Sequence, residues 1–95
     1  MSASQTVETP MDVVRLFLDE NVFIKLRGNR ELTGKLHSFD DHLNLVIGDA
    51  EETVYTTDLI EETNEEISHS KKRSIPMLFV RGDAIVLISQ NKSKI

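Results

Sequence analysis

The apolar positions near the start of the chain have the spacing of a helix. Met11, Val14 and Leu18 are three, four or seven residues apart, so they fall on one helical face. Thr9 is a favourable N-cap, and Pro10 suits the first helical position because it needs no backbone N–H there. The pattern therefore predicts a short amphipathic helix of about ten residues that ends near residue 20 or 21.

From residue 22 onward, apolar and polar residues alternate, which predicts β-strands. Gly34 lies inside the second predicted strand, where a glycine indicates a sharp bend or a close approach of backbones. Five short strands are too few for two good sheets, so we predict an all-β fold in which one strongly bent sheet closes into a small barrel. The predicted strands are 22–26, 32–39, 43 to about 57, 75–80 and 84–89.

A strongly charged segment overlaps the end of the third predicted strand and continues toward the fourth. Residues 49–66 contain eight acidic residues and no basic one, and Lys71-Lys72-Arg73 follows. We predict a solvent-exposed charged loop. The alternatives are that the acidic run binds a partner, and that the basic triplet is a nuclear-import signal or a phosphate contact.

Composition narrows the class of protein. With 95 residues the chain has room for one domain. It has no cysteine, which excludes a disulfide framework, an iron–sulfur cluster and a zinc finger. The first ten residues are polar and no apolar run is long enough to cross a membrane, so we expect a location in the cytosol or nucleus and no membrane partner.

Net charge limits how the chain could contact nucleic acid. The formal net charge is −5, so a broad basic surface for phosphates is not available. Any RNA contact is expected to be a small site that reads bases, with a shallow dependence of affinity on salt.

The sequence offers little material for catalysis. There is no glycine-rich phosphate loop, no nucleophilic serine turn and no cysteine nucleophile. Glu51 and Glu52 point to opposite faces of a strand, so they cannot act as one acid/base pair. The histidines His37, His42 and His69 lack the spacing of metal ligands. We predict a non-enzymatic protein with no cofactor and no metal.

The two C-terminal predicted strands contain no charged residue. Outer strands of a small monomeric barrel usually carry charges that prevent pairing with other chains. Either the helix buries both strands or they pair with neighbouring chains, and we favour pairing. Two different adhesive edges on one subunit imply head-to-tail contacts that close into a ring. The interface residues are then Met77, Leu78, Phe79, Val80, Ile85, Val86, Leu87 and Ile88.

Two motifs, far apart and in the correct order, carry a resemblance to a known family. The first is the run Phe39-Asp40-Asp41-His42-Leu43-Asn44-Leu45, with Gly28 and Gly34 before it and Glu51-Glu52 after it; it resembles the first Sm motif. The second, Phe79-Val80-Arg81-Gly82-Asp83, resembles the second Sm motif. Residues 10–89 are therefore similar to an Sm-like (LSm) domain, between a flexible N-terminal tail of residues 1–9 and a C-terminal tail of residues 90–95.

The resemblance implies a fold and an assembly. The Sm fold is a strongly bent, five-stranded antiparallel barrel behind a short N-terminal helix. Family members join the fourth strand of one subunit to the fifth strand of the next in heptameric rings, so other LSm subunits are the implied partners; an isolated chain can form a homomeric ring. RNA binds around the central hole.

The resemblance also implies particular RNAs. Three segments are most similar to a eukaryotic branch of the family whose members belong to two heteroheptameric rings: residues 10–16, Glu51-Glu52-Thr53 and residues 75–83. The nuclear ring binds the uridine-rich 3′ end of U6 small nuclear RNA in pre-mRNA splicing. The cytoplasmic ring binds the 3′ ends of deadenylated mRNA and works with decapping and decay factors. The implied localisation is therefore nucleus and cytoplasm.

The motifs assign roles to individual residues. His42 stands where the family stacks a side chain on a base, Asn44 reads the base, and Asp40 orients Asn44. Arg81 and Gly82 form the second loop, with Arg81 on the opposite side of the base. An asparagine amide offers an acceptor and a donor side by side, which is complementary to uracil, and a planar ring stacks on any base.

Some residues depart from the family pattern or allow a simpler interpretation. Leu43 replaces a common methionine, and Asp83, which replaces a common asparagine, puts a negative charge near the pore. Without the second motif, Asp40-Asp41-His42 would be interpreted as a surface turn. Arg81-Gly82-Asp83 also spells an adhesion tripeptide, although a hairpin turn explains it. The functional prediction is a non-catalytic RNA-binding ring subunit; the alternative is a structural barrel that completes the ring with little RNA contact.

Overall fold

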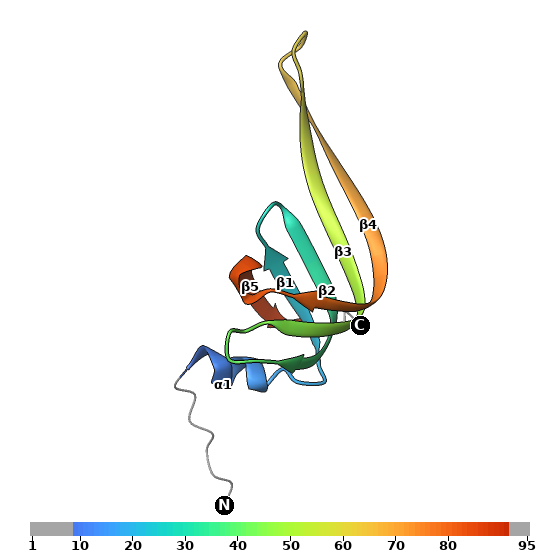
Figure 1. The fold of residues 1–95 in the computed structure, drawn as a ribbon. Helices are drawn as coiled ribbons and strands as arrows, with labels where there is room; N and C mark the ends of the chain where they lie inside the picture. The colour runs from blue at the N-terminus through green and yellow to red at the C-terminus, as the bar shows by residue number, and fades with distance from the viewer. Residues whose placement is uncertain (1–8, 92–95) are drawn as a thin grey trace, which may run out of the picture.

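The computed structural model describes residues 9–91. One helix precedes five strands that form a single antiparallel sheet, as Figure 1 shows. The predicted tails, 1–9 and 90–95, fall outside the described residues except for their innermost positions. The elements are α1 (Pro10–Arg15), β1 (Asn21–Leu26), β2 (Arg30–Phe39), β3 (Leu45–Ile60), β4 (Glu65–Val80), the short 3₁₀ helix η1 (Gly82–Ala84) and β5 (Ile85–Gln90).

Helix α1 begins as predicted but ends earlier. Thr9 is the N-cap, and its side chain accepts a hydrogen bond from the backbone N–H of Asp12 at 3.3 Å. The Asp12 carboxylate in turn accepts one from the backbone N–H of Thr9 at 3.0 Å. The predicted end near residue 20 is wrong, because the helix stops at Arg15. Asp19 takes a left-handed φ of 63° and its N–H donates to the carbonyl oxygen of Leu36 at 2.8 Å. Beyond Arg15 the chain continues in tighter hydrogen-bonded turns up to Glu20, whose N–H donates to the carbonyl oxygen of Phe17 at 3.0 Å, and the bond to β2 forms within this segment.

The sheet has the strand order β4-β3-β2-β1-β5, and its inner face forms the core. Gly34 confirms the predicted bend. The register between β2 and β3 shifts at this position, and a Cβ on Gly34 would overlap the Ile47 side chain and lie 2.9 Å from the carbonyl oxygen of Gly48. The buried apolar residues are Val14, Val22, Ile24, Leu32, Leu36, Leu45, Ile47, Ala50 and Val80.

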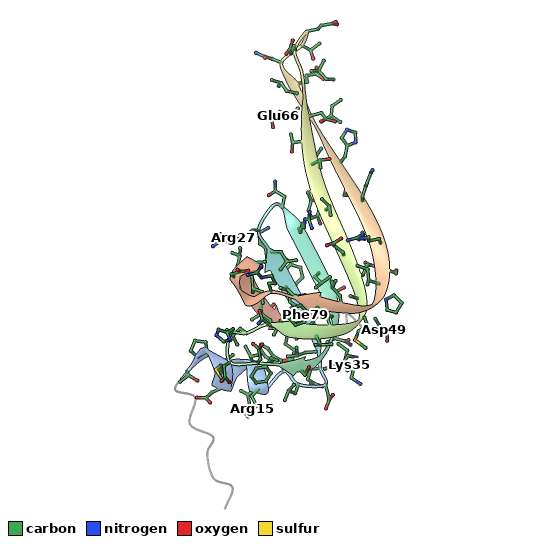
Figure 2. The ribbon with its side chains drawn as sticks, in the orientation of Figure 1. Arg15, Arg27, Lys35, Asp49, Glu66 and Phe79 are labelled. Carbon is green, nitrogen blue, oxygen red and sulfur yellow. The ribbon has the colours of Figure 1, made fainter. Side chains whose placement is uncertain are left out.

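The prediction of a charged loop is wrong. Residues 49–66 and the triplet Lys71-Lys72-Arg73 belong to β3 and β4, which pair without interruption from Ala50–Ile75 to Ile60–Glu65. The strand predicted to start at residue 43 starts at Leu45. The hairpin projects beyond the rest of the sheet, with side chains such as Glu66 in solvent (Figures 1 and 2). Both of its faces are solvated there, so no apolar alternation marks the strands in the sequence.

One acidic residue of this hairpin is buried. Glu52 is only 5% exposed, and its carboxylate lies 2.7 Å from the Nε of Arg73 and 3.8 Å from an Nη of Arg30. The three side chains come from β3, β4 and β2, so the ion pairs join these strands at the base of the hairpin. The prediction that residues 49–66 are exposed to solvent is therefore wrong for Glu52.

Strands β4 and β5 are the two outer strands of the sheet. The helix does not bury them, because Met77, Phe79, Val86 and Leu87 are each at least half exposed. Leu78, Ile85 and Ile88 are half-buried. Val80 is 5% exposed and belongs to the core, so its side chain is not available to the predicted ring interface. Within residues 9–91, no helix has the length and apolar character needed to cross a membrane.

Candidate nucleic-acid interface

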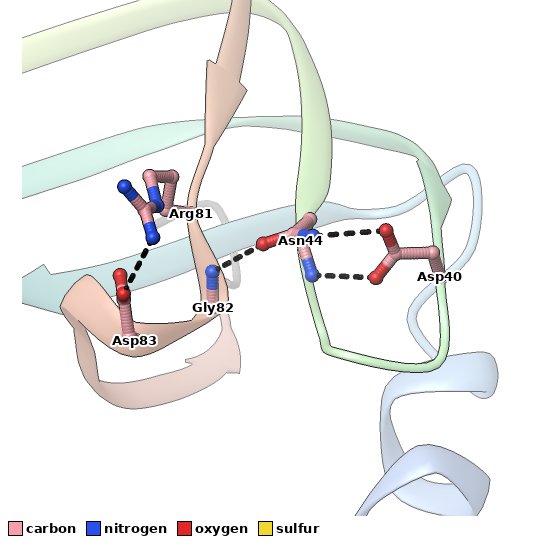
Figure 3. A network of polar contacts seen from close by, with 5 residues as sticks. All are labelled: Asp40, Asn44, Arg81, Gly82 and Asp83. Atoms are coloured by element: carbon pink, nitrogen blue, oxygen red, sulfur yellow. Dashed lines mark hydrogen bonds and ion pairs between the residues drawn. The ribbon is translucent and has the colours of Figure 1, made fainter.

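Two loops that are distant in sequence meet at one place on the surface (Figure 3). The first, residues 40–44, joins β2 to β3, and the second, residues 81–84, joins β4 to β5. In the first loop, Asp40 Oδ1 accepts hydrogen bonds from the backbone N–H groups of His42 at 2.9 Å and Asn44 at 3.0 Å. Leu43 adopts a left-handed φ of 59°. The aspartate thus closes a tight turn around its own backbone.

Asp40 is held in its ionised form. The hydrogen bonds from the side chain and backbone of Asn44 keep the pKa of the Asp40 carboxyl below its usual value. Its other oxygen, Oδ2, accepts from Asn44 Nδ2 at 2.9 Å. Near neutral pH, Asp40 therefore presents only acceptors to its neighbours.

The amide of Asn44 has one orientation because its two partners have fixed polarity. The Asp40 carboxylate only accepts, so it faces Nδ2, and the backbone N–H of Gly82 only donates, so it meets Oδ1 at 2.8 Å. An asparagine amide has two N–H groups and an oxygen with two lone pairs. One N–H and one lone pair therefore remain for a ligand, at a fixed angle to each other.

Gly82 makes this contact possible. A Cβ at this position would overlap the carbonyl oxygen of His42 and lie 3.0 Å from the carbonyl carbon of Leu43. Only glycine lets the second loop come close enough for its N–H to reach Asn44. The motif resemblance pointed to Gly82, but its bond to Asn44 crosses 38 positions and leaves no sign in the local sequence.

The meeting point is an open hollow of about 550 Å³. Four of the five predicted RNA-binding residues line it. The fifth, Asp40, is not in the lining and is hydrogen-bonded to Asn44. Phe79, predicted only at the ring interface, also lines the hollow and is 62% exposed. Its position two residues before Arg81 was the available signal: Arg81 directly follows β4 with an extended backbone, and residues two apart in extended chain share a face. The lining residues are His42, Asn44, Phe79, Arg81, Gly82 and Asp83.

The chemistry of this hollow suits a flat, neutral, hydrogen-bonding ligand. His42 and Phe79 supply rings for stacking, Asn44 supplies one donor and one acceptor, and Arg81 supplies a planar cation that can lie over a ring. Arg81 Nη2 lies 2.9 Å from Asp83 Oδ2. Among residues 9–91 no group of three or more histidine or acidic side chains is placed to hold a metal ion.

The chain is similar to proteins of one family. Residues 12–90 match the LSM domain model. A "Probable U6 snRNA-associated Sm-like protein LSm3" of Dictyostelium discoideum is 56% identical over 84 residues, covering 88% of this chain and 87% of that protein. The "LSM complex subunit lsm3" of Schizosaccharomyces pombe is 49% identical over 89 residues, covering 94% of this chain and 96% of the relative.

One similar protein has been solved with a ligand bound. The Pyrococcus abyssi Sm protein, solved in complex with a uridine heptamer, is 31% identical and superposes with a TM-score of 0.64, covering 88% of this chain and 100% of that protein. The likeness extends over most of this chain and the whole of that protein. It is therefore a likeness of the whole domain rather than of one motif.

Proposed function

Because this chain belongs to the LSM domain family, we propose that it is a non-catalytic subunit of heteroheptameric LSm rings that bind uridine-rich RNA 3′ ends. Residues 10–89 form its Sm-like domain. In the nucleus its RNA is the U6 small nuclear RNA of the splicing machinery, the RNA named for the Dictyostelium relative. In the cytoplasm its RNA is deadenylated mRNA, and decapping and decay factors are further partners.

The fixed amide of Asn44 is the observation that carries this proposal. Uracil presents an N–H next to a carbonyl oxygen along one edge. The free lone pair of Asn44 Oδ1 accepts from that N–H, and the free Nδ2–H donates to that oxygen. Cytosine has an acceptor where uracil has its N–H, so the same amide orientation rejects it. Asp40 and Gly82 thus make Asn44 a reader of uracil by holding it from two sides.

Stacking supplies the affinity. His42 and Arg81 both line the hollow, on the first and second loop respectively. A uracil held by Asn44 between them is covered on both faces, by a ring on one side and a guanidinium on the other. Each subunit of a ring adds one such weak site, and the ring sums them because binding of one nucleotide raises the local concentration of the next.

A structural role with little RNA contact is the second candidate. The exposed apolar residues on β4 and β5 favour it, because they suit contacts between subunits whether or not RNA is bound. The two candidates differ in what His42 contributes to RNA binding by the assembled ring.

A His42→Ala subunit in an assembled ring should bind oligouridine more weakly. Loss of one stacked base costs about 1–3 kcal/mol, or about 5–150-fold in affinity. Fluorescence anisotropy with a labelled uridine oligomer measures this. His69→Ala is the matched control, since His69 is an exposed histidine on the distant hairpin. Unchanged affinity in the His42 variant would favour the structural role.

A charge on the outer face of β5 should weaken ring assembly. Val86 is 61% exposed, so Val86→Lys leaves the core of one chain intact, while in the ring it would place an ammonium group in an apolar interface. Light scattering after gel filtration should show smaller species than the wild-type ring. Leu59→Lys is the control, because Leu59 is 59% exposed near the far end of the hairpin. An intact ring carrying Val86→Lys would contradict pairing through β5.

A further inference from the structure

Asp83 is the one acidic residue that lines the hollow. It lies in the first turn of η1, two positions after Arg81, and its Oδ2 is 2.9 Å from Arg81 Nη2 (Figure 3). Apart from His42, the lining therefore carries one positive and one negative side chain, and these two face each other. When a ligand enters the hollow, Arg81 is already paired with the carboxylate of Asp83.

The pairing is weak as a source of stability. The side chains of Arg81 and Asp83 are 75% and 68% exposed, and ion pairs so exposed contribute little to folding. A phosphate must compete with Asp83 for Nη2 of Arg81. A neutral base has no such competition, because it takes the flat face of the guanidinium and leaves the ion pair in place.

We propose that Asp83 is a specificity-determining residue that directs Arg81 toward the base and away from the RNA phosphates. The inference rests on the proposed uridine binding and adds to it. Neutralising the cation lowers the share of affinity that comes from any nucleic-acid backbone, and holding one edge of the guanidinium keeps its face available for stacking. The site therefore gives up affinity for phosphates in exchange for a larger share of affinity from the base.

The test is Asp83→Asn in the assembled ring, measured against a uridine oligomer and an abasic oligomer of the same length. The variant should bind the abasic oligomer more tightly and so reduce the ratio of uridine to abasic affinity. The slope of log affinity against log salt should steepen by about 0.7, the value for one additional single-strand phosphate contact. The change should disappear in an Arg81→Gln background.

Asp41→Asn is the matched control. Asp41 is an exposed acid on the neighbouring loop that does not line the hollow, so its substitution removes the same charge without freeing Arg81. If Asp83→Asn leaves the slope and the ratio unchanged, or changes them only as Asp41→Asn does, the inference is overturned. A wild-type ring that binds neither oligomer would overturn the proposed function and this inference with it.

Discussion

A Gly82→Ala variant is expected to lose uridine binding and thermal stability together. The added Cβ would overlap the carbonyl oxygen of His42, so the two loops must separate and the 2.8 Å bond from Gly82 N–H to Asn44 must break. Overpacking of this kind costs about 1–3 kcal/mol. A domain of this size loses about 4–8 °C of melting temperature per kcal/mol. Thermal unfolding and oligouridine anisotropy on the same preparation measure both effects.

Gly28→Ala is the control variant, because it adds backbone strain without disturbing the candidate RNA site. Gly28 also needs glycine, because its φ is 78°, but a Cβ there would meet no atom within 4 Å. A left-handed alanine costs about 1–2 kcal/mol, so this variant should melt at a lower temperature and still bind oligouridine. If Gly82→Ala binds oligouridine as the wild type does, the close approach of the two loops is not what holds Asn44 in place.

Arg73→Gln is expected to destabilise the fold by about 1–3 kcal/mol, because the buried Glu52 carboxylate loses its closest partner. It would leave the buried carboxylate of Glu52 with only Arg30, at 3.8 Å, in place of the 2.7 Å contact to Arg73. The reciprocal change, Glu52→Gln, should cost less, because the arginine side chains that it leaves are 52% and 67% exposed and water can solvate them. Urea unfolding of the purified chain compares the two variants.

Lys72→Gln is the control for this pair of variants. Lys72 lies beside Arg73 on β4, and its Nζ is 4.0 Å from the exposed carboxylate of Glu51. Its loss should change stability by less than about 1 kcal/mol. Equal losses for Arg73→Gln and Glu52→Gln would show that the hydrogen bond, rather than the buried charge, holds the base of the hairpin.

The sequence predicts the fold best where one face of a strand is buried. The strand predicted at 22–26 appears as Asn21–Leu26, and the one at 32–39 lies within Arg30–Phe39. Prediction fails where a contact distant in sequence decides the outcome. The segment after α1 forms tight turns and bonds to β2 through Asp19 and Leu36, where the sequence pattern predicted more helix. Solvation of both faces leaves no apolar alternation in the outer half of the β3–β4 hairpin.

The candidate site, too, was predictable only in part. The side chains His42, Asn44 and Arg81 stand in two recognisable motifs, so the sequence names them. Their geometry depends on backbone groups, above all the N–H of Gly82, whose position no composition or spacing reports. The sequence pattern did not reveal the burial of Glu52, because its acidic neighbours indicated a solvent-exposed segment. Its partner Arg73 lies on another strand, so the ion pair leaves no local signal in the sequence.

The unequal lengths of the outer strands would show in images of the particle. Strand β4 has 16 residues and β5 has six, so a neighbour's β5 can pair with only part of β4 in the proposed ring. The rest of the hairpin would stand out from the particle as an arm (Figure 1). Rings of similar subunits are hard to align in rotation by electron microscopy. Where neighbouring subunits have shorter hairpins, this arm is a built-in fiducial mark that fixes the order of the chains.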